Sequence, residues 1–542
     1  MTSFSELVRH FFGRFFDKES LSPQGETETN LIQILSLLAV PGLFIAFWIL
    51  PRAPITGWPL IAERYFFVSY PMIMMGFAMV FEWDALFPDR RDYLILTPLP
   101  IRLSAIFGAK LAALCIFLAL FAVDVNIFGI LLFPGISGAP DYRNALLAHV
   151  VAVLAGTLFM ALAAAAIQGI LIAFLSDKMF RRVSSALQAL LMGLLVMTLF
   201  LHPFIVSHLR SLVERSSPAL AWFPPFWFLG LYEWIYPAGP TPVALGDLSL
   251  RAVQALAIAA ATFLFTYVAG YRRHSRRAAD TVETNPAGPG RLMKAASALL
   301  DRTVLTHPLQ RAAFHFISQT IARSLKHRLF LATYGGFGAA IAASSLGSGR
   351  SGLLPLPLTL SFFLVSGLRA AFNFPSELRA NWVFQVTDRE DRTECLAATR
   401  KWIVICGILP LFALVAPVEF AAFPWTTALF HLAFGITLSV VLMQIMFFTF
   451  RKVPFTCSYF PGKVNLVWLS VLYLYGFTTY SYTMSGLEGW LAEAPLRAVV
   501  FFGLAVVACR TLARWREREV GIMLSLDFED TPDPVVRTLD LS

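Results

Sequence analysis

Apolar residues recur along the chain in long runs that are separated by short polar segments. A run of about 20 apolar residues, wound as a helix, crosses a hydrocarbon core about 30 Å thick. Because the backbone in lipid must satisfy its own hydrogen bonds, runs of this length are helices rather than strands. The pattern predicts an all-α polytopic membrane protein with about 12 transmembrane helices in two pseudo-symmetric six-helix halves.

The runs fall into two sets with a basic stretch between them. In the first set we expect spans at residues 31–50, 65–81, 107–133, 146–175, 184–206 and 252–271. In the second set we expect spans at residues 329–346, 356–371, 402–420, 429–450, 464–482 and 499–512. The predicted organisation is a six-span half at 1–271, a cytoplasmic linker at 272–308, a second six-span half at 309–512 and a polar cytoplasmic tail at 513–542.

An amphipathic helix is expected before the first span of each half. Between residues 3 and 19, phenylalanines and leucines follow helical spacing with basic residues between them, which is typical of an interfacial helix. Charges interrupt this segment, so it is not a signal peptide. Residues 309–329 show the same spacing and predict a second such helix. Ahead of it, the sequence Asn-Pro-Ala-Gly-Pro-Gly at 285–290 is typical of a linker.

The composition agrees with surfaces that face lipid. Hydrophobic residues make up 57% of the chain and charged residues 14%, against about 25% charged in an average globular protein. The net charge of +9 would indicate nucleic-acid binding only on a soluble domain with a basic face, whereas here the basic residues lie between apolar runs. With the N-terminus inside, about 35 of the 43 lysines and arginines are cytoplasmic, as the positive-inside rule requires. We expect the bacterial cytoplasmic (inner) membrane, with both termini in the cytoplasm.

The cytoplasmic loop after the second predicted span mixes acidic, basic and apolar residues. It runs from Phe81 to Arg102 and reads FEWDALFPDRRDYLILTPLPIR. We expect a short amphipathic helix at residues 91–96, ended by the turn at 97–100, lying at the membrane surface where a cytoplasmic partner could push it. The alternative is a solvated loop between two spans.

With Glu82, Asp92, the Leu-Pro-Ile sequence at 99–101 and Lys110 near the start of the next span, the first half resembles the permease subunits of type-2 ABC exporters. The amphipathic N-terminal helix, the six spans and the long external segment before the sixth span agree with that family. There the loop forms a coupling helix that docks on the ATPase. The resemblance therefore implies ATPase contacts by Asp89, Arg90, Arg91, Asp92, Tyr93, Leu94, Leu96, Pro98, Leu99, Pro100, Ile101 and Arg102.

The loop after the eighth predicted span follows a similar order. It starts at Phe372, passes through a proline and acidic turn, and continues as an aromatic and aliphatic helix that ends in Thr387. This similarity suggests a degenerate internal duplication, although Leu-Pro-Ile is missing. The corresponding ATPase contacts would be made by Glu377, Arg379, Trp382, Asp388 and Arg389.

The chain carries no motif for chemistry of its own. No Gly-x-x-x-x-Gly-Lys-Ser/Thr sequence occurs, so ATP and Mg²⁺ would be bound by a separate ATPase subunit, expected as a pair of copies. No His-Glu-x-x-His helix or Ser-His-Asp order stands out. The five cysteines form no Cys-x-x-Cys pair, and all lie in predicted spans or on the cytoplasmic side, which argues against disulfides and zinc. We expect no metal, no cofactor and no enzymatic activity in this chain.

Polar residues inside predicted spans are costly in lipid and mark candidate functional positions. A translocation path or proton relay would use polar residues of the third, fourth, ninth and tenth predicted spans: Asp124, Asn126, His149, Gln168, Glu419, His431 and Gln444. The alternative is that Asp124 and His149, with Glu419 and His431, lie near external span ends and meet water or headgroups. In that alternative the two glutamines make interhelical hydrogen bonds.

The external segment at 222–237 contains too many prolines for an ordinary span and too many aromatic residues for a solvated loop. We expect short re-entrant helices there, and the family resemblance implies an external gate formed by Trp222, Pro224, Pro225, Trp227, Tyr232 and Glu233. Glu233 would either contact a cationic substrate or lie at the rim, exposed to water.

These patterns predict the membrane-spanning permease subunit of an ABC-type exporter that moves an unidentified substrate. A proton-coupled secondary transporter and a membrane-embedded transferase are the alternatives.

Overall fold

The computed structural model describes residues 3–13, 40, 43–44, 47–83, 86, 96, 98, 101–239, 243–280, 291–347, 349–376, 381, 383, 392–457 and 466–522. Every regular element in these ranges is a helix, and none of these residues lies in a strand. The all-α fold predicted from the apolar runs is confirmed.

Ten helices in the described ranges are long and apolar enough to cross a membrane, and they overlap ten of the expected spans. The chain is therefore a multi-pass membrane protein. The first expected span, at 31–50, lies mostly outside the described residues. The eleventh, at 464–482, is found as a segmented helix made of α20 (Leu466–Thr478), the π turn η6 (Thr479–Thr483) and α21 (Met484–Ala492).

The chain divides into two compact units. Unit 1 consists of Met1–Leu191 and Leu201–Ala287, and unit 2 consists of Met192–Phe200 and Gly288–Ser542. The division at residues 287 and 288 falls inside the stretch expected to be a linker. Both ends of that stretch are helical: α10 (Val243–Asp280) continues to residue 280, and α11 (Arg291–Thr303) begins directly after the Pro and Gly residues at 286–290.

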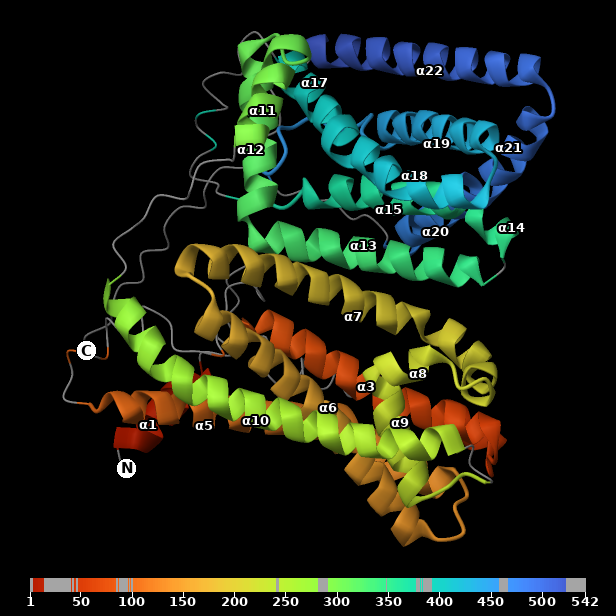
Figure 1. Ribbon diagram of the computed structural model, residues 1–542. Helices are drawn as coiled ribbons and strands as arrows, with labels where there is room; N and C mark the ends of the chain where they lie inside the picture. Colours follow the sequence, from red (N-terminus) through yellow and green to blue (C-terminus); the bar gives the residue numbers. More distant parts are fainter. Residues whose placement is uncertain are drawn as a thin grey trace, which may run out of the picture. The chain divides into compact units, whose positions relative to one another are not determined.

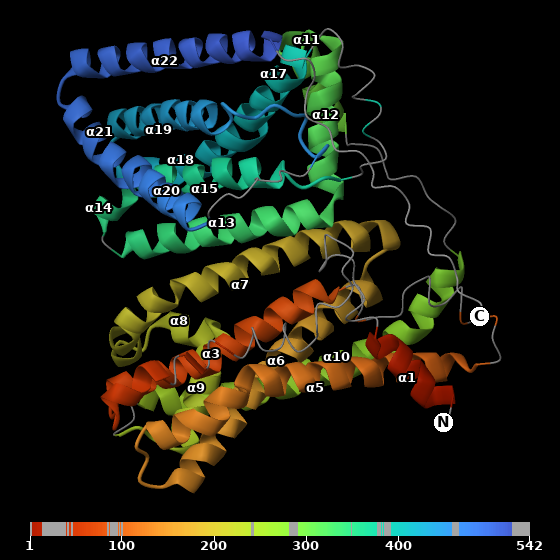
Figure 2. The same ribbon diagram turned by 180° about the vertical axis from the view of Figure 1, so that it is seen from behind.

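Unit 1 is built from long helices that run side by side. Helix α1 lies at one end of α3, α5, α6 and α10, and the short helices α8 and α9 lie at the other end (Figures 1 and 2). The helices are α1 (Ser3–Gly13), η2 (Leu50–Arg52), α3 (Trp58–Phe81), α5 (Leu103–Ile136), α6 (Tyr142–Phe174), α7 (Asp177–Glu214), α8 (Pro218–Trp222), α9 (Pro224–Ile235) and α10 (Val243–Asp280).

Helix α6 packs against α3, α5, α9 and α10 and so occupies the middle of unit 1. Its many alanines and glycines allow this close packing, since small residues let helix backbones approach each other in a membrane. A Cβ atom at Gly169 would lie 2.2 Å from the Thr266 Oγ1 of α10, and one at Gly156 would lie 2.9 Å from the Met72 Sδ of α3. A larger residue at Gly169 would therefore collide with α10, whereas one at Gly156 would displace the flexible Met72 side chain.

Unit 2 has a comparable layout. Helices α11 and α12 lie at one end of α13, α15, α19 and α22, and α14 and α21 lie at the other end (Figures 1 and 2). Besides α11, α20, η6 and α21, the helices are α12 (Pro308–Arg323), α13 (Leu325–Leu346), α14 (Arg350–Leu353), α15 (Leu356–Ala371), α17 (Arg392–Trp402), the π turn η5 (Ile403–Ile408), α18 (Leu409–Ala422), α19 (Trp425–Met446) and α22 (Pro495–Ile522).

An aromatic core stabilises the α12 end of unit 2. Phe372, which follows α15, lies between Trp402 of α17 and Phe447, with ring centroids 6.1 and 5.9 Å away. Phe455 lies 5.2 Å from Phe372, edge to face, and all four side chains are buried. Such pairs add about 0.5–1.5 kcal/mol each beyond the burial of their area. This core holds the ends of α15, α17 and α19 together.

Candidate functional site

Most of the residues predicted to contact an ATPase lie outside the described part of the chain. These are Asp89, Arg90, Arg91, Asp92, Tyr93, Leu94, Leu99, Pro100, Glu377, Arg379, Trp382, Asp388 and Arg389. Of the remaining four, Leu96 and Ile101 are half-buried, and Pro98 and Arg102 are exposed. Arg102 has an extended backbone and precedes the first residue of α5, so it marks where the first loop joins the third span.

The base of the first loop is braced by α1. Leu7 and Phe11 of α1 are buried, whereas Glu6, Arg9 and His10 are exposed, as expected for an amphipathic helix. Helix α1 packs on the first turns of α5. The Lys110 ammonium lies 5.5 Å from the centroid of the Phe11 ring. The amphipathic helix and the third span therefore form one packed element directly after the loop.

A corresponding element is found in unit 2, where α12 packs on α17. The Trp402 indole Nε1 of α17 donates to the Ser318 Oγ of α12 at 2.8 Å. Lys401 Nζ donates to the Gln310 Oε1 at 2.6 Å and to the Val304 carbonyl at 2.7 Å. Helix α12 thus braces the helix that follows the second loop, as α1 braces α5 in unit 1.

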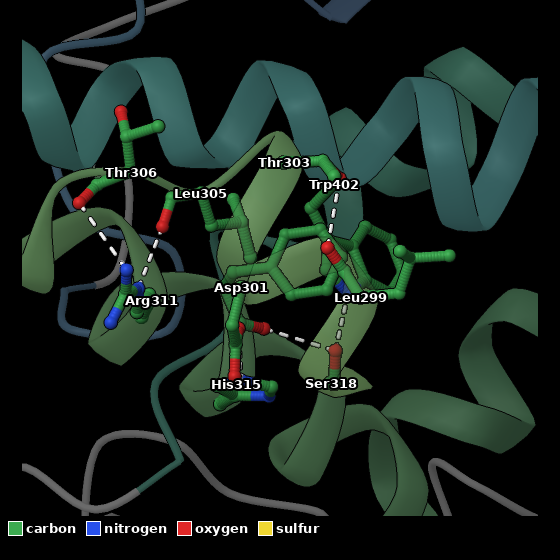
Figure 3. Close-up of polar contacts among 10 residues, drawn as sticks. Leu299, Asp301, Thr303, Leu305, Thr306, Arg311, His315, Ser318 and Trp402 are labelled. Carbon is green, nitrogen blue, oxygen red and sulfur yellow. Dashed lines mark hydrogen bonds and ion pairs between the residues drawn. The ribbon is translucent and has the colours of Figure 1, made fainter. Parts of the chain in front are cut away.

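Helix α11 extends this element (Figure 3). Asp301 of α11 faces His315 of α12, with the Asp301 Oδ1 3.0 Å from the His315 Nε2. Arg311 donates from Nε to the Leu305 carbonyl at 2.7 Å, which fixes the turn between the two helices. The segment before α12 is therefore part of the folded unit rather than a free connection.

Five of the candidate translocation residues, Asp124, Asn126, His149, Gln168 and Gln444, do not converge on one site. Asn126 of α5 donates from Nδ2 to the Thr157 Oγ1 of α6 at 3.3 Å, and Gln168 donates to the Trp83 carbonyl at 2.7 Å. Gln444 lines a cavity of about 480 Å³ beside α17. Asp124 is half-buried, and its Oδ2 has no hydrogen-bond partner among the described residues. No hydrogen bond in the described part of the chain joins one of these residues to another.

A buried ion pair joins α3 to α9 in unit 1. The Arg64 Nη1 lies 2.7 Å from the Glu233 Oε1, and the two side chains are 2% and 0% exposed. The same Nη1 donates to the Tyr236 carbonyl at 2.7 Å. The second oxygen of Glu233 accepts from the backbone N–H of Ala238 at 2.9 Å. The Arg64 guanidinium also lies over the Tyr232 ring, 4.5 Å from its centroid.

This pair corrects the expected surroundings of two residues. Glu233 is not a rim carboxylate exposed to water, because the aromatic segment folds into α8 and α9 and brings the last turn of α9 against Arg64. His149 is likewise buried rather than in contact with water or headgroups. Its Nδ1 lies 3.2 Å from the Tyr232 hydroxyl, and its ring packs against Phe133 at 5.3 Å.

The candidate gate residues differ in exposure. Trp222 at the end of α8 is 85% exposed, whereas Tyr232 and Glu233 are buried in α9. Pro224 and Pro225 occupy the first turn of α9, where a missing N–H has no helical partner to lose. Trp227 donates from Nε1 to the Ala221 carbonyl at 3.1 Å, which ties α9 to α8.

A second buried polar cluster lies at the α21 end of unit 2. The His431 Nδ1 lies 2.5 Å from the Glu488 Oε1, and the His431 Nε2 lies 3.6 Å from the Glu419 Oε1. All three residues are buried, so the expectation that Glu419 and His431 meet water or headgroups is wrong for this structure. The turn between α18 and α19 is short, and α21 packs against α19, so the three side chains face one another.

The two clusters occupy comparable places. His149 and His431 both lie about two turns into their helices, α6 and α19. Glu233 and Glu488 both lie on short helices that precede the last helix of their unit. Sequence reasoning missed Arg64 and Glu488. Each is a charged residue inside or beside an apolar run, and that was the signal that could have identified them.

Within the described residues no group of three or more His, Cys, Asp or Glu side chains is arranged to hold a metal ion. Comparison of the chain with protein-family models, with curated proteins and with solved structures finds no match.

Proposed function

We propose that the chain is the membrane-spanning permease subunit of an ABC-type exporter in a bacterial inner membrane. Its spans form two halves, and a separate ATPase subunit supplies the energy. The observation that carries this proposal is the repeated element at the base of each third span: α1 packed on α5, and α12 packed on α17. In both cases the element directly follows the loop that the family resemblance implies is pushed by the ATPase.

In each unit the loop is attached to a pair of packed helices, which can move as one rigid body. A loop that enters an isolated helix would bend only the first turn of that helix, because local contacts there are few. Here the buried Leu7 and Phe11 join α1 to α5, and the Trp402–Ser318 bond joins α17 to α12. A partner that displaces either loop would therefore move two helices together.

Helix α3 connects the first loop to the candidate gate. Phe81 at its C-terminal end leads into the loop, and Arg64 near its N-terminal end is paired with Glu233 of α9. The two residues are about 26 Å apart along the helix axis at about 1.5 Å per residue. The gate would respond to the ATPase because the ion pair makes α9 follow α3. We place the loop in the cytoplasm and α9 at the external face, as the positive-inside rule predicts.

Affinity purification of the tagged full-length chain from its own membranes tests this proposal. We expect a soluble ATP-hydrolysing subunit to co-purify, and its ATPase activity to rise in the presence of the chain. Charge reversal in the first loop, Asp92→Arg or Arg102→Glu, should abolish both effects. Arg143→Glu is the matched control, because Arg143 is exposed at the start of α6, at the opposite end of unit 1.

The proposal fails if the wild-type chain brings down no ATPase. It also fails if the loop variants and Arg143→Glu behave alike, since the loop would then make no specific contact.

A further inference from the structure

The cluster of Glu419, His431 and Glu488 has more acidic than basic groups in a buried place. The three side chains come from α18, α19 and α21, and their exposed fractions are 0%, 2% and 4%. Both Glu419 oxygens, the His431 Nε2 and the Glu488 Oε2 have no hydrogen-bond partner among the described residues. Glu419 is therefore a fully buried carboxyl group that faces an imidazole but accepts no hydrogen bond.

No permanent cation balances these carboxyl groups in the described part of the chain. The charged groups that act on His431 are Glu488 and Glu419 themselves. On the neighbouring α22, Arg497 instead contacts Glu493 at 3.2 Å and the Trp490 carbonyl at 3.1 Å. The Tyr480 hydroxyl of η6 lies 2.9 Å from the Ser361 hydroxyl and 3.2 Å from the Ser439 hydroxyl.

The possible protonation states of the cluster differ greatly in the free energy needed to bury them. With both glutamates ionised and the imidazole protonated, the cluster keeps a net charge of about −1, and an uncompensated buried charge costs several kcal/mol. Two carboxylates that share one site cannot both ionise easily, so one of them holds a proton. With one carboxylate, one imidazolium and one neutral carboxyl group, the net charge of the cluster is zero, and no buried charge is left uncompensated.

We infer that Glu419, His431 and Glu488 form a proton-binding site. His431 carries a proton on each ring nitrogen, donates from Nδ1 to Glu488 and points Nε2 toward Glu419. A further proton from solvent binds a carboxylate oxygen of Glu419, which is the carboxyl group with no partner of its own. No other atom changes in this step, and the proton returns to water when the site releases it.

The position of the site gives the proton a structural effect. The cluster joins α18 and α19 to α21, the short helix before the last span, at the end of unit 2 opposite to α12. The bound proton keeps these helices together, because without it the two carboxylates repel each other. Entry of water at this end would favour the ionised state and release α21. Opening of this end of unit 2 is thus coupled to proton release.

Infrared spectroscopy of the purified full-length chain in lipid nanodiscs tests the site without an ATPase. The wild type should show a carbonyl band of a protonated carboxyl group at neutral pH, and this band should disappear at high pH. Glu419→Gln and Glu488→Gln should each remove it, since one imidazolium then balances the one remaining carboxylate. His431→Gln should increase the band about twofold, because both carboxyl groups must then be neutral. A purely structural role for His431 predicts no such increase.

Two matched variants control for other carboxyl groups. Glu493→Gln removes an exposed carboxylate near the same end, and Asp124→Asn removes a half-buried one in unit 1. Both should keep the band. The inference is overturned if the wild type lacks the band, or if both Glu419→Gln and Glu488→Gln retain it. It is also overturned if Na⁺ at constant pH abolishes the band, because a metal cation would then be the ligand.

Discussion

The buried pair of Arg64 and Glu233 should contribute far more to stability than a surface pair of the same chemistry. Removing one partner of a buried ion pair leaves a lone charge in a low-dielectric interior, which costs about 3–5 kcal/mol. Glu233→Gln keeps the shape and an acceptor for the Ala238 N–H but leaves the Arg64 guanidinium uncompensated. We expect a loss of about 3 kcal/mol, which is more than a hundredfold in the folding equilibrium.

The surface pair of Arg210 and Glu214 on α7 is the matched control. Its ion pair is of similar length, 2.8 Å against 2.7 Å, but its side chains are 68% and 50% exposed. Exposed pairs at this spacing contribute about 0.3–0.5 kcal/mol because water screens them. Glu214→Gln should therefore change stability by less than about 0.5 kcal/mol.

Equilibrium unfolding of the full-length chain in mixed detergent and SDS micelles measures both variants on one scale. A third variant checks the mechanism: Arg64→Met with Glu233→Leu removes both charges, and it should be more stable than Arg64→Met alone. The reasoning is refuted if Glu233→Gln costs no more than Glu214→Gln. It is also refuted if the loss of stability of the double variant, relative to wild type, equals the sum of the losses of Arg64→Met and Glu233→Leu, because the two charges would then act independently.

Two further predictions concern packing and use the same unfolding assay. A Cβ atom at Gly230 of α9 would lie 2.5 Å from the Leu245 carbonyl oxygen, so Gly230→Ala should lower the free energy of unfolding by about 1–3 kcal/mol. Gly246 has open space around it, so Gly246→Ala should cause no loss. Equal effects of the two substitutions would contradict the close approach of α9 and α10. Trp83 is fully buried, and its indole N–H donates to the Ser184 hydroxyl of α7 at 2.8 Å. Trp83→Phe should therefore lower the free energy of unfolding by about 1–3 kcal/mol, and Trp222→Phe, at an exposed site, by less than about 0.5 kcal/mol. A Trp83→Phe variant as stable as wild type would show that the hydrogen bond contributes nothing.

The positions of the helices could be read from the sequence, because membrane spans are set by the length of apolar runs. The eighth span was expected at residues 356–371, and α15 occupies Leu356–Ala371. The segmentation of the eleventh could not be read, since the π turn η6 falls at Thr479–Thr483, where the change from apolar to hydroxyl side chains does not by itself indicate a change in helical pitch. Hydrophobicity reports that a segment is buried in lipid or protein, but it does not report local changes in helical pitch.

The polar partners could not be predicted for a different reason. Arg64 and Glu233 are 169 residues apart, and nothing in the local pattern of either one indicates the other. Glu233 was expected either to contact a cationic substrate or to lie at a rim exposed to water. The structure differs because α9 folds back on α3, and the arginine there neutralises the charge. The pairing depends on contacts between segments far apart in the chain, whereas the periodicity of a single sequence describes only neighbouring residues.

The two clusters explain how similar arrangements could serve different purposes. In unit 1 the acidic residue before the last helix is matched by the guanidinium of Arg64, so the pair requires no proton from solvent to balance its charges. In unit 2 the described residues offer only His431 against two glutamates, so the balance requires a proton from solvent. The proton of unit 2 can dissociate into water, whereas the guanidinium of Arg64 is a fixed part of the chain. We therefore expect the α9 end of unit 1 to be a fixed connection to α3, and the α21 end of unit 2 to be the one that responds to its surroundings.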